Sequence, residues 1–342
     1  MLKIKPFLQL CLLIVIVSAG CKTRTGTETP ESLVSDTSSY RSGIDLSNIR
    51  IGYSSPSLNA PYYVVLSKAI QKNVEDYGMK FIPADGQDDI TKQITSVEDL
   101  LAAGANVLIL NPLDPKALVP AVNDAVKSGI PVFIIDSYID PSANYICYVQ
   151  ADNEGNGELI GEWIAKQLGS TEIKAALISG REGNPVGREK RLGFVRGFTE
   201  TQLMLQGHAN LNIVSHGWGN WTNNGGLKAM EDILVAHPDV NVLVAENDAM
   251  AMGALKAIDE SGKSGKIIIA GFDGQKEAYE LIIAGKIGAT ALNPPGIMAK
   301  LVVEAAVKYL NNERNINKVI HTPAAIITRE NVDRFYDPKA IF

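Results

Sequence analysis

Short apolar runs alternate with helical patterns along most of this 342-residue chain, and this alternation limits the fold more than any other feature. Between the runs, apolar residues lie three and four positions apart, as in PYYVVLSKAIQKNVEDYG at 61–78. Strand–helix alternation of this kind predicts an α/β fold in which helices cover both faces of parallel sheets. The candidate strands are RIGYS (50–54), KFIPAD (80–85), NVLIL (106–110), PVFII (131–135), YICYV (145–149), KAALIS (174–179), LNIVSH (211–216), NVLVA (241–245), KIIIAG (266–271) and KIGATAL (286–292).

About ten strands are more than one sheet of this kind usually holds, so the sequence favours two sheets of roughly five or six strands each. Right-handed crossover connections make each of them a doubly wound sheet. The break between them is expected at 149–154, because the same alternation starts again after the fifth strand.

The composition is that of a globular protein, with 46% apolar and 20% charged residues. The formal net charge of −6 argues against a nucleic-acid partner, because binding to a phosphate backbone requires a basic surface. The charge does not argue against a small neutral ligand.

Residues 1–20 have the layout of a secretory signal peptide, with two lysines, an apolar run over 7–17 and small residues at its end. The run is shorter than the ~20 residues that a membrane-spanning helix needs. The segment SAGC at 18–21 is similar to a bacterial lipobox, although Ser18 stands where Leu or Val is usual. We therefore expect Cys21 to be lipidated; an ordinary signal peptide that happens to contain a cysteine is the alternative.

Residues 21–48 are expected to form the lipidated cysteine and a flexible tether, because they are rich in Ser and Thr and poor in apolar residues. Cys11 would leave with the signal peptide. Cys147 then remains, and its apolar surroundings in YICYV predict an inert buried thiol.

Polar and aromatic residues collect immediately after the apolar runs. In doubly wound sheets, ligands bind outside the carboxyl ends of the strands, so these positions mark the expected site. They are PSLNAPYY (56–63), NPLD (111–114), Asp136-Ser137, Asp152-Asn153, GREGNPVGREKR (180–191), GWGNWTNN (217–224), END (246–248), GFDG (271–274) and Asn293.

Several of these residues have a plain structural interpretation, because Asp and Asn before a helix are often N-caps. Capping is at least as good an explanation as ligand binding for the polar residues at 114 and 152–153. In the END segment, Asn247 is the expected ligand contact and Asp248 the expected cap of the following helix. Glu246 is expected to point to solvent or towards a hinge.

Aromatic rings near Asp, Asn and Arg side chains match the chemistry of a sugar. A sugar offers apolar C–H faces for stacking and hydroxyls for hydrogen bonds to charged groups. Trp218 and Trp221 lie in a glycine-rich loop that fits this role. The alternatives are that Tyr62 and Tyr63 belong to the core and that Arg188 is a surface residue.

No motif predicts a metal or a cofactor. The four histidines lack the spacing of metal ligands. GNGELIG at 155–161 has three residues, not two, before its last glycine, and so fails as a dinucleotide fingerprint. No nucleophile elbow occurs.

Several segments, in a fixed order, carry a family resemblance: PSLNAPYYVVL, LILNPLDPKALVPAV, PVFIIDS, ADNEGNGELIGEWIA, GREKRLGF, AHPDVNVLVAENDAMAMGALKAI, GFDG and GKIGATALNP. In them the chain resembles bacterial periplasmic sugar-binding proteins of the ribose/galactose type, the receptors of ABC importers, over nearly all of 49–330. The resemblance implies two doubly wound parallel-sheet lobes joined by a three-stranded hinge, which closes over a ligand cleft. It implies an N-terminal lobe of 49–151 plus 294–322 and a C-terminal lobe of 152–293 plus 323–342.

The same resemblance implies a set of ligand-binding residues. They are Tyr62, Tyr63 and Trp221 as stacking aromatics, and Asp136, Arg188, Asn247, Asp273 and Asn293 as partners of sugar hydroxyls. Ser137, directly after Asp136, is the ninth expected contact.

The chain departs from the ribose-type pattern in its first lobe. Ser137 stands where those receptors have Arg, which replaces five donors and a positive charge with one hydroxyl. Pro56 and Ala60 stand where Ser and Asn are frequent. Because the first lobe offers fewer polar groups than a ribose site, another pentose, a hexose or a polyol fits as well as ribose.

The sequence therefore predicts a monomeric, lipid-anchored extracytoplasmic receptor that delivers a monosaccharide or polyol to an ABC permease and performs no chemistry. One alternative is a sensor that feeds a chemoreceptor or a kinase. A glycoside-cleaving enzyme would need an acid/base pair from Asp136, Asp248 and Asp273, and the sequence distinguishes none of them as acid or nucleophile.

Overall fold

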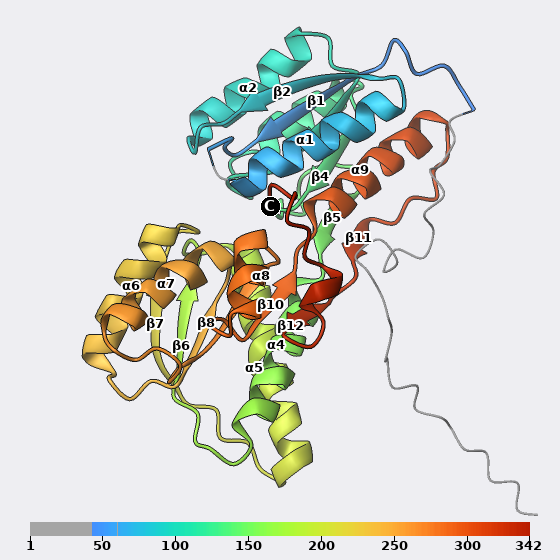
Figure 1. The fold of residues 1–342 in the computed structure, drawn as a ribbon. Helices are drawn as coiled ribbons and strands as arrows, with labels where there is room; N and C mark the ends of the chain where they lie inside the picture. Colours follow the sequence, from blue (N-terminus) through green and yellow to red (C-terminus); the bar gives the residue numbers. More distant parts are fainter. Residues whose placement is uncertain (1–42, 60) are drawn as a thin grey trace, which may run out of the picture.

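Two six-stranded sheets, each with helices on both faces, form two lobes in the computed structural model (Figure 1). The structure describes residues 43–59 and 61–342, so the expected signal peptide and Cys21 lie outside the described residues. The first lobe contains β1 (Arg50–Ser55), α1 (Pro61–Asp76), β2 (Lys80–Asp85), α2 (Ile90–Ala102), β3 (Val107–Leu110), α3 (Val119–Lys127), β4 (Val132–Ile135), β5 (Tyr148–Ala151), α9 (Pro295–Leu310) and β11 (Val319–Thr322).

The second lobe repeats the plan. It contains α4 (Asn153–Leu168), β6 (Ala175–Ser179), α5 (Pro185–Gln206), β7 (Ile213–Trp218), α6 (Asn223–Ala236), β8 (Val242–Ala245), α7 (Asp248–Glu260), β9 (Ile268–Asp273), α8 (Lys276–Ile283), β10 (Ala289–Leu292), β12 (Ile326–Thr328) and the 3-10 turn η1 (Val332–Arg334). The strand orders are β11-β5-β4-β3-β1-β2 and β12-β10-β9-β8-β6-β7. The predicted α/β fold with two doubly wound lobes is confirmed.

The chain passes between the sheets three times, and always at the same side. It passes from β5 to α4, from β10 to α9, and from β11 to β12. Strands β11 and β12 form the edges of their sheets on that side, whereas β2 and β7 form the opposite edges. The cleft between the lobes therefore has a hinge at one side and an opening at the other.

Two strands, β11 and β12, are missing from the sequence prediction. Strand β11 reads VIHT and is largely exposed, and β12 has three residues, so neither carries the apolar run that reveals the others. Strand β12 pairs with β10 in antiparallel orientation. The second sheet is thus mixed at its hinge edge, not wholly parallel.

The central strands are buried on both faces, which explains their unbroken apolar sequences. In β3, Val107 and Ile109 pack towards α1 and α9, while Leu108 and Leu110 pack into the cluster beneath α2 and α3. Alternate residues of β8 divide in the same way between two clusters of the second lobe. The carboxyl ends of the strands are then the free positions where polar residues can gather.

Helices α4 and α5 approach each other backbone to backbone. The contact runs along Gly157 and Gly161 of α4 and along Gly193 and Gly197 of α5. A Cβ atom at Gly197 would lie 2.1 Å from the carbonyl oxygen of Glu158. Because no side chain separates the helices, α5 holds a fixed position against α4, which starts at the hinge.

The end of the chain contacts both lobes. Phe335 and Tyr336 pack against the core of the second lobe. Phe342 instead meets Tyr62 of the first lobe, with ring centroids 5.5 Å apart. The tail, expected to belong to the second lobe, therefore returns to the first.

Within residues 43–59 and 61–342, no helix has both the length and the apolar character that crossing a bilayer requires. Cys147 is buried as predicted, and burial raises the pKa of its thiol to about 12.

Gly197→Ala should lower the free energy of unfolding by about 1–3 kcal/mol or more, because the added methyl group forces the two helix backbones apart. Gly296→Ala is the matched control: it lies in the first turn of α9, and a Cβ there meets nothing within 4 Å. Urea unfolding measures both. Equal stabilities of the two variants would contradict the close packing of α4 on α5.

Candidate ligand-binding site

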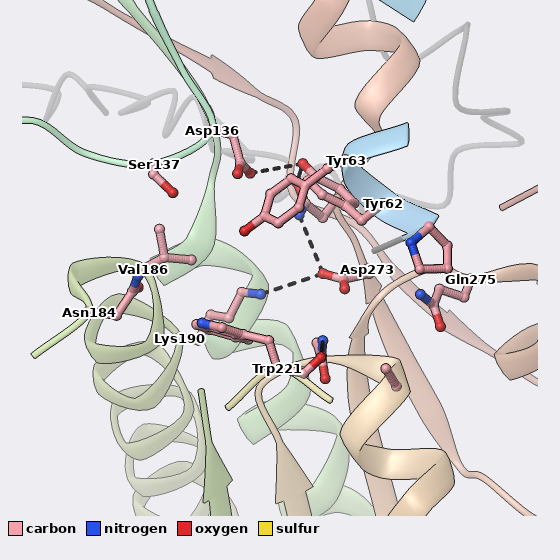
Figure 2. A pocket seen from close by; sticks show the side chains of 14 residues that line it. Tyr62, Tyr63, Asp136, Ser137, Asn184, Val186, Lys190, Trp221, Asp273 and Gln275 are labelled. Atoms are coloured by element: carbon pink, nitrogen blue, oxygen red, sulfur yellow. Dashed lines mark hydrogen bonds and ion pairs between the residues drawn. The ribbon is translucent and has the colours of Figure 1, made fainter. Parts of the chain in front are cut away.

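A cavity of about 660 Å³, including its open mouth, lies between the lobes at the carboxyl ends of the strands. Both lobes contribute to its wall (Figure 2). Its lining residues are Pro61, Tyr62, Tyr63, Asp136, Ser137, Asn184, Val186, Lys190, Trp221, Asn247, Ala249, Asp273, Gln275 and Asn293. Eight of the nine residues proposed as ligand contacts from the sequence thus lie together, and Arg188 does not.

The first lobe contributes two tyrosines from the start of α1 and a carboxylate from the end of β4. Tyr62 donates its hydroxyl hydrogen to Asp136 Oδ1 at 2.8 Å, and Asn111 Nδ2 donates to Asp136 Oδ2 at 3.0 Å. The rings of Tyr62 and Tyr63 meet edge to face, 5.7 Å apart. Burial raises the pKa of Asp136, while its bonds to Tyr62 and Asn111 favour the charged form. Asp136 is therefore a pre-positioned acceptor beside two aromatic rings.

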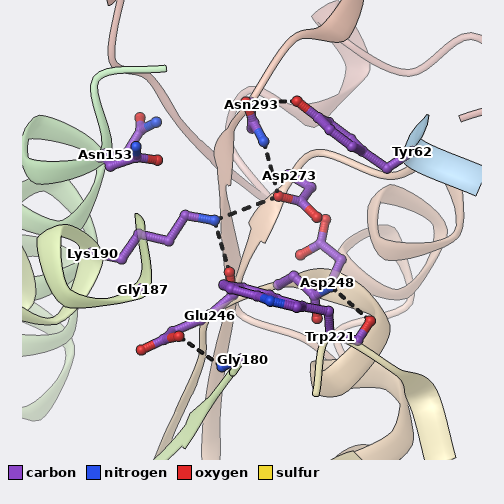
Figure 3. A network of polar contacts seen from close by, with 12 residues as sticks. Tyr62, Asn153, Gly180, Gly187, Lys190, Trp221, Glu246, Asp248, Asp273 and Asn293 are labelled. Carbon is purple, nitrogen blue, oxygen red and sulfur yellow. Dashed lines mark hydrogen bonds and ion pairs between the residues drawn. The ribbon is translucent and has the colours of Figure 1, made fainter. Parts of the chain in front are cut away.

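The second lobe contributes a buried cation beside a buried carboxylate. Lys190 Nζ lies 3.6 Å from Asp273 Oδ1 and donates to the carbonyl oxygen of Glu246 at 2.8 Å (Figure 3). Asn293 Nδ2 donates to the same oxygen of Asp273 at 3.3 Å. Burial raises the pKa of Asp273 to about 6, even though Lys190 lowers it. This carboxylate is costly to keep charged and is available to hydroxyl donors.

Trp221 lies flat against the backbone at the end of β6. A Cβ atom at Gly180 would lie 2.0 Å from its indole ring, so no other residue fits beneath it. Trp221 and the preceding Asn220 both have positive φ, 63° and 51°, and Asn247 Nδ2 donates to the Trp221 carbonyl oxygen at 3.2 Å. The chain thus holds the indole in a strained turn where one face can meet a ligand.

The structure corrects the assignment of Arg188. Its side chain is exposed, whereas Lys190 is 3% exposed and lines the cavity. Residues two apart on an α-helix lie roughly 200° apart around its axis, so the two point to opposite faces of α5. The cation of the site is Lys190.

The structure also corrects the roles of Glu246 and Asp248. Glu246 does not point to solvent: its carboxylate is buried, accepts from Ser179 Oγ and from the Gly180 N–H, and pairs with Arg191. The cap of α7 is Asn247, whose Oδ1 accepts from the Met250 N–H at 2.8 Å. Asp248 is instead the first residue of the helix.

Asp248 is fully buried and holds the neighbouring loop. Its Oδ2 accepts from the N–H groups of Gly274 and Gln275 at 2.9 Å each, and its Oδ1 accepts from Thr290 Oγ1 at 2.7 Å. Burial and the nearby Asp273 raise its pKa, and these three donors oppose that shift. Of the END segment, only Asn247 lines the cavity, and Glu246 and Asp248 stabilise the loops behind it.

Some cavity residues were not named individually from the sequence: Lys190, Asn184 and Val186 lie within the expected segment 180–191, and Gln275 follows directly after GFDG. Asn184 caps α5, with Oδ1 accepting from the Gly187 N–H. The sequence signal that could have identified Lys190 is its position in GREKR (187–191), a segment already expected at the site, two residues after Arg188. Trp218, which the sequence offered beside Trp221 as an aromatic of the site, does not line the cavity and is 38% exposed. The neighbouring His216 does not line it either, and its Nε2 lies 2.7 Å from Ser179 Oγ.

One ion pair joins the lobes across the opening of the cleft. Arg181 Nη2, in the loop after β6, lies 3.0 Å from Asp88 Oδ1, in the loop after β2. Asp88 and the preceding Gln87 both have positive φ, 56° and 52°. This loop is held by Asp85, whose Oδ1 accepts from the Gln87 N–H at 2.9 Å.

The family model described as the periplasmic binding protein domain matches residues 51–314. The chain belongs to the periplasmic binding protein family. It is 36% identical over 280 residues to the ribose import binding protein of Bacillus subtilis, an alignment that covers 82% of this chain and 87% of that protein.

Solved structures of related proteins share the two-lobe fold. An ABC transporter solute-binding protein from Mycobacterium smegmatis with bound glycerol is 32% identical, with a TM-score of 0.76 over 84% of this chain and 96% of that one. A periplasmic solute-binding protein from Actinobacillus succinogenes with bound D-allose is 25% identical, with a TM-score of 0.77 over 84% of this chain and all of that one.

Lys190→Met should lower the free energy of unfolding at pH 7.5 by about 3–5 kcal/mol, because it leaves the Asp273 carboxylate buried without a counter-charge. The folded-state pKa of Asp273 is about 6 even with Lys190 beside it, and removal of the ammonium raises this pKa further. The loss should therefore shrink as the pH falls towards about 6 and stay small below it, where the carboxyl is protonated in both folded proteins. Urea unfolding at pH 7.5 and at pH 5 measures both effects.

Lys166→Met is the control, since Lys166 forms an exposed pair with Glu162. The double change of Lys190→Met with Asp273→Asn should recover most of the stability. A loss that stays constant with pH would show that the Lys190 ammonium does not compensate the Asp273 charge.

Proposed function

We propose that this member of the periplasmic binding protein family binds a monosaccharide or a related polyol between its lobes and delivers it to an ABC permease. The observation that carries the proposal is the composition of the cavity wall. Aromatic rings of Tyr62 and Trp221 come from opposite lobes, and so do the carboxylates of Asp136 and Asp273. Rings match the C–H faces of a sugar, and carboxylates match its hydroxyls.

Closure of the lobes gives the receptor a loaded state that a permease can distinguish. A ligand shifts an open–closed equilibrium only if it binds the closed form more tightly. Tyr62 supports this coupling, because its hydroxyl lies 2.8 Å from Asp136 and 3.4 Å from Oδ1 of Asn293 at a hinge crossing. A ligand that contacts these groups touches both lobes and the hinge at once.

The proposed ligand is broader than ribose, although a relative is a ribose import binding protein. Ser137 lines the first-lobe wall and presents a small hydroxyl there. The related structures carry D-allose or glycerol, which are both polyhydroxylated. The site suits a neutral compound of this class, because its wall carries two carboxylates against one ammonium and therefore disfavours an anion.

We also propose that the protein binds without chemistry, as a monomer on the outer side of a membrane. Both cavity carboxylates accept hydrogen bonds from amides or a tyrosine, which suits acceptors more than an acid/base pair. The relatives are import binding proteins, and the N-terminal sequence predicts a signal peptide and a lipid on Cys21.

A thermal-shift screen of pentoses, hexoses and polyols should show a rise in melting temperature with at least one compound, because a ligand of the folded state stabilises it by mass action. Trp221→Ala should weaken that compound by about 2 kcal/mol or more in calorimetric titration, through lost stacking. Trp218→Ala is the control, since Trp218 lies outside the cavity lining. Turnover of the compound, or equal losses from both variants, would contradict the proposal.

Cys21→Ser should move the protein from the membrane fraction to the soluble fraction of expressing bacterial cells, because one acyl-bearing cysteine is the expected anchor. Metabolic labelling with a radioactive fatty acid measures the modification itself. Unchanged labelling in the variant would remove Cys21 as the lipid site.

A further inference from the structure

Gln275 is a cavity residue whose side chain takes no part in holding the fold together. It lies between β9 and α8 and is 7% exposed, and it lines the cavity. Figure 2 shows Asp273 between Lys190 on one side and Gln275 on the other. The amide of Gln275 therefore extends the polar wall beyond the Lys190–Asp273 pair.

Gln275 occupies the N-cap position of α8 without serving as a cap. Ser, Thr, Asp and Asn are the residues that usually cap a helix through their side chains. Gln275 has extended backbone angles (φ −67°, ψ 145°), and its side chain makes no hydrogen bond to the first turn of α8. Helix initiation therefore does not explain a glutamine at this position.

The backbone of Gln275 is nevertheless fixed. Its N–H donates to Oδ2 of the buried Asp248 at 2.9 Å, as does the Gly274 N–H. Asp273, next to Gly274, has a φ of 116°, which is strained for a residue with a side chain. Asp248 thus holds Asp273 and Gln275 in a rigid loop, so both side chains have a set place in the wall.

The amide of Gln275 has no hydrogen-bond partner within the described part of the chain. Other amides that line the cavity are occupied: Asn293 donates to Asp273, Asn247 accepts from Met250, and Asn184 accepts from Gly187. Gln275 is 7% exposed as a residue, and the part of its amide that remains accessible lies at the cavity, where water or a ligand can bind it. Its position in the cavity indicates the ligand as the partner.

We propose that Gln275 determines specificity by binding one hydroxyl group of the sugar or polyol, next to the hydroxyl that Asp273 binds. This inference rests on the proposed function. An amide can donate through Nε2 and accept through Oε1, so it satisfies both halves of a hydroxyl. It does so without adding a third negative charge to the site.

Asp273 and Gln275 together favour a ligand with hydroxyl groups on adjacent carbon atoms. Asp273 accepts from one hydroxyl, and Gln275 donates to or accepts from the next. A site that is built to hydrogen-bond a hydroxyl rejects an analogue that lacks it, because its own polar group is then left unpaired. The pair therefore selects vicinal diols over the corresponding deoxy compounds.

The test is calorimetric titration of the full chain and of Gln275→Met with D-ribose, D-allose, D-galactose and myo-inositol. The compound that the wild-type protein binds most tightly should bind Gln275→Met about three- to tenfold more weakly, the size of a neutral hydrogen bond. Its monodeoxy derivatives are then titrated. One of them should bind the wild-type protein and the variant equally, because it lacks the hydroxyl that faces Gln275.

A second readout separates recognition from a structural role. The ligand-free melting temperature of Gln275→Met should equal or exceed that of the wild-type protein, because the variant loses an unpaired polar group and no internal bond. Gln71→Met is the matched control for affinity, since Gln71 is exposed on α1 and bonds to Glu75.

The outcomes are distinct. Equal affinity of wild type and Gln275→Met for every compound bound, or equal weakening of every deoxy derivative, overturns the role of Gln275 and leaves the proposed function standing. A lower ligand-free melting temperature assigns Gln275 a structural role and also overturns the inference. A wild-type protein that binds none of the four compounds or of the wider screen removes the proposed function, and the role of Gln275 with it.

Discussion

The buried ammonium group of Lys190 connects the parts of the second lobe that form its half of the site. It joins α5 to β8 through the Glu246 carbonyl oxygen and to β9 through Asp273. Its Nζ also lies 4.9 Å from the ring centroid of Phe272 and 5.6 Å from that of Trp221. A buried ammonium requires such an environment, because an unpaired charge cannot be desolvated at acceptable cost. The glycine contact between α4 and α5 matters here, since it fixes the helix that carries Lys190.

The three polar residues at the end of β8 show how a strand end can support a site from behind. Glu246 holds Gly180, on which the Trp221 ring lies, and Asn247 holds the Trp221 backbone. Asp248 holds the loop that presents Asp273. Their polar atoms are satisfied inside the protein, so the aromatic and acidic groups that face the cavity stay in place before any ligand arrives. The site is preorganised, which reduces the conformational entropy lost on binding.

The fold was predictable because the apolar runs of the central strands reflect burial on both faces. The strand-end rule then gave the segments of the site, and the family resemblance chose nine residues in them, of which eight line the cavity. The failures have local causes. Arg188 and Lys190 are both cations on α5 and point to opposite faces of it. The sequence alone does not show which of these faces meets the cavity. Asn247 and Asp248 are both good capping residues, so the start of α7 was misplaced by one position. Gln275 has no recognisable sequence signal. Its proposed role rests on the absence of a hydrogen-bond partner for its side-chain amide among the described residues, which only the structure reveals.

The ion pair between Asp88 and Arg181 lies at the side of the cleft opposite the three chain crossings. The pair links the two lobes on this side, so it has to separate when the lobes move apart there. Both side chains are half-exposed, so dissolved salt weakens their attraction. The strength of this contact between the lobes therefore falls as the ionic strength of the surrounding medium rises, whichever ligand is bound.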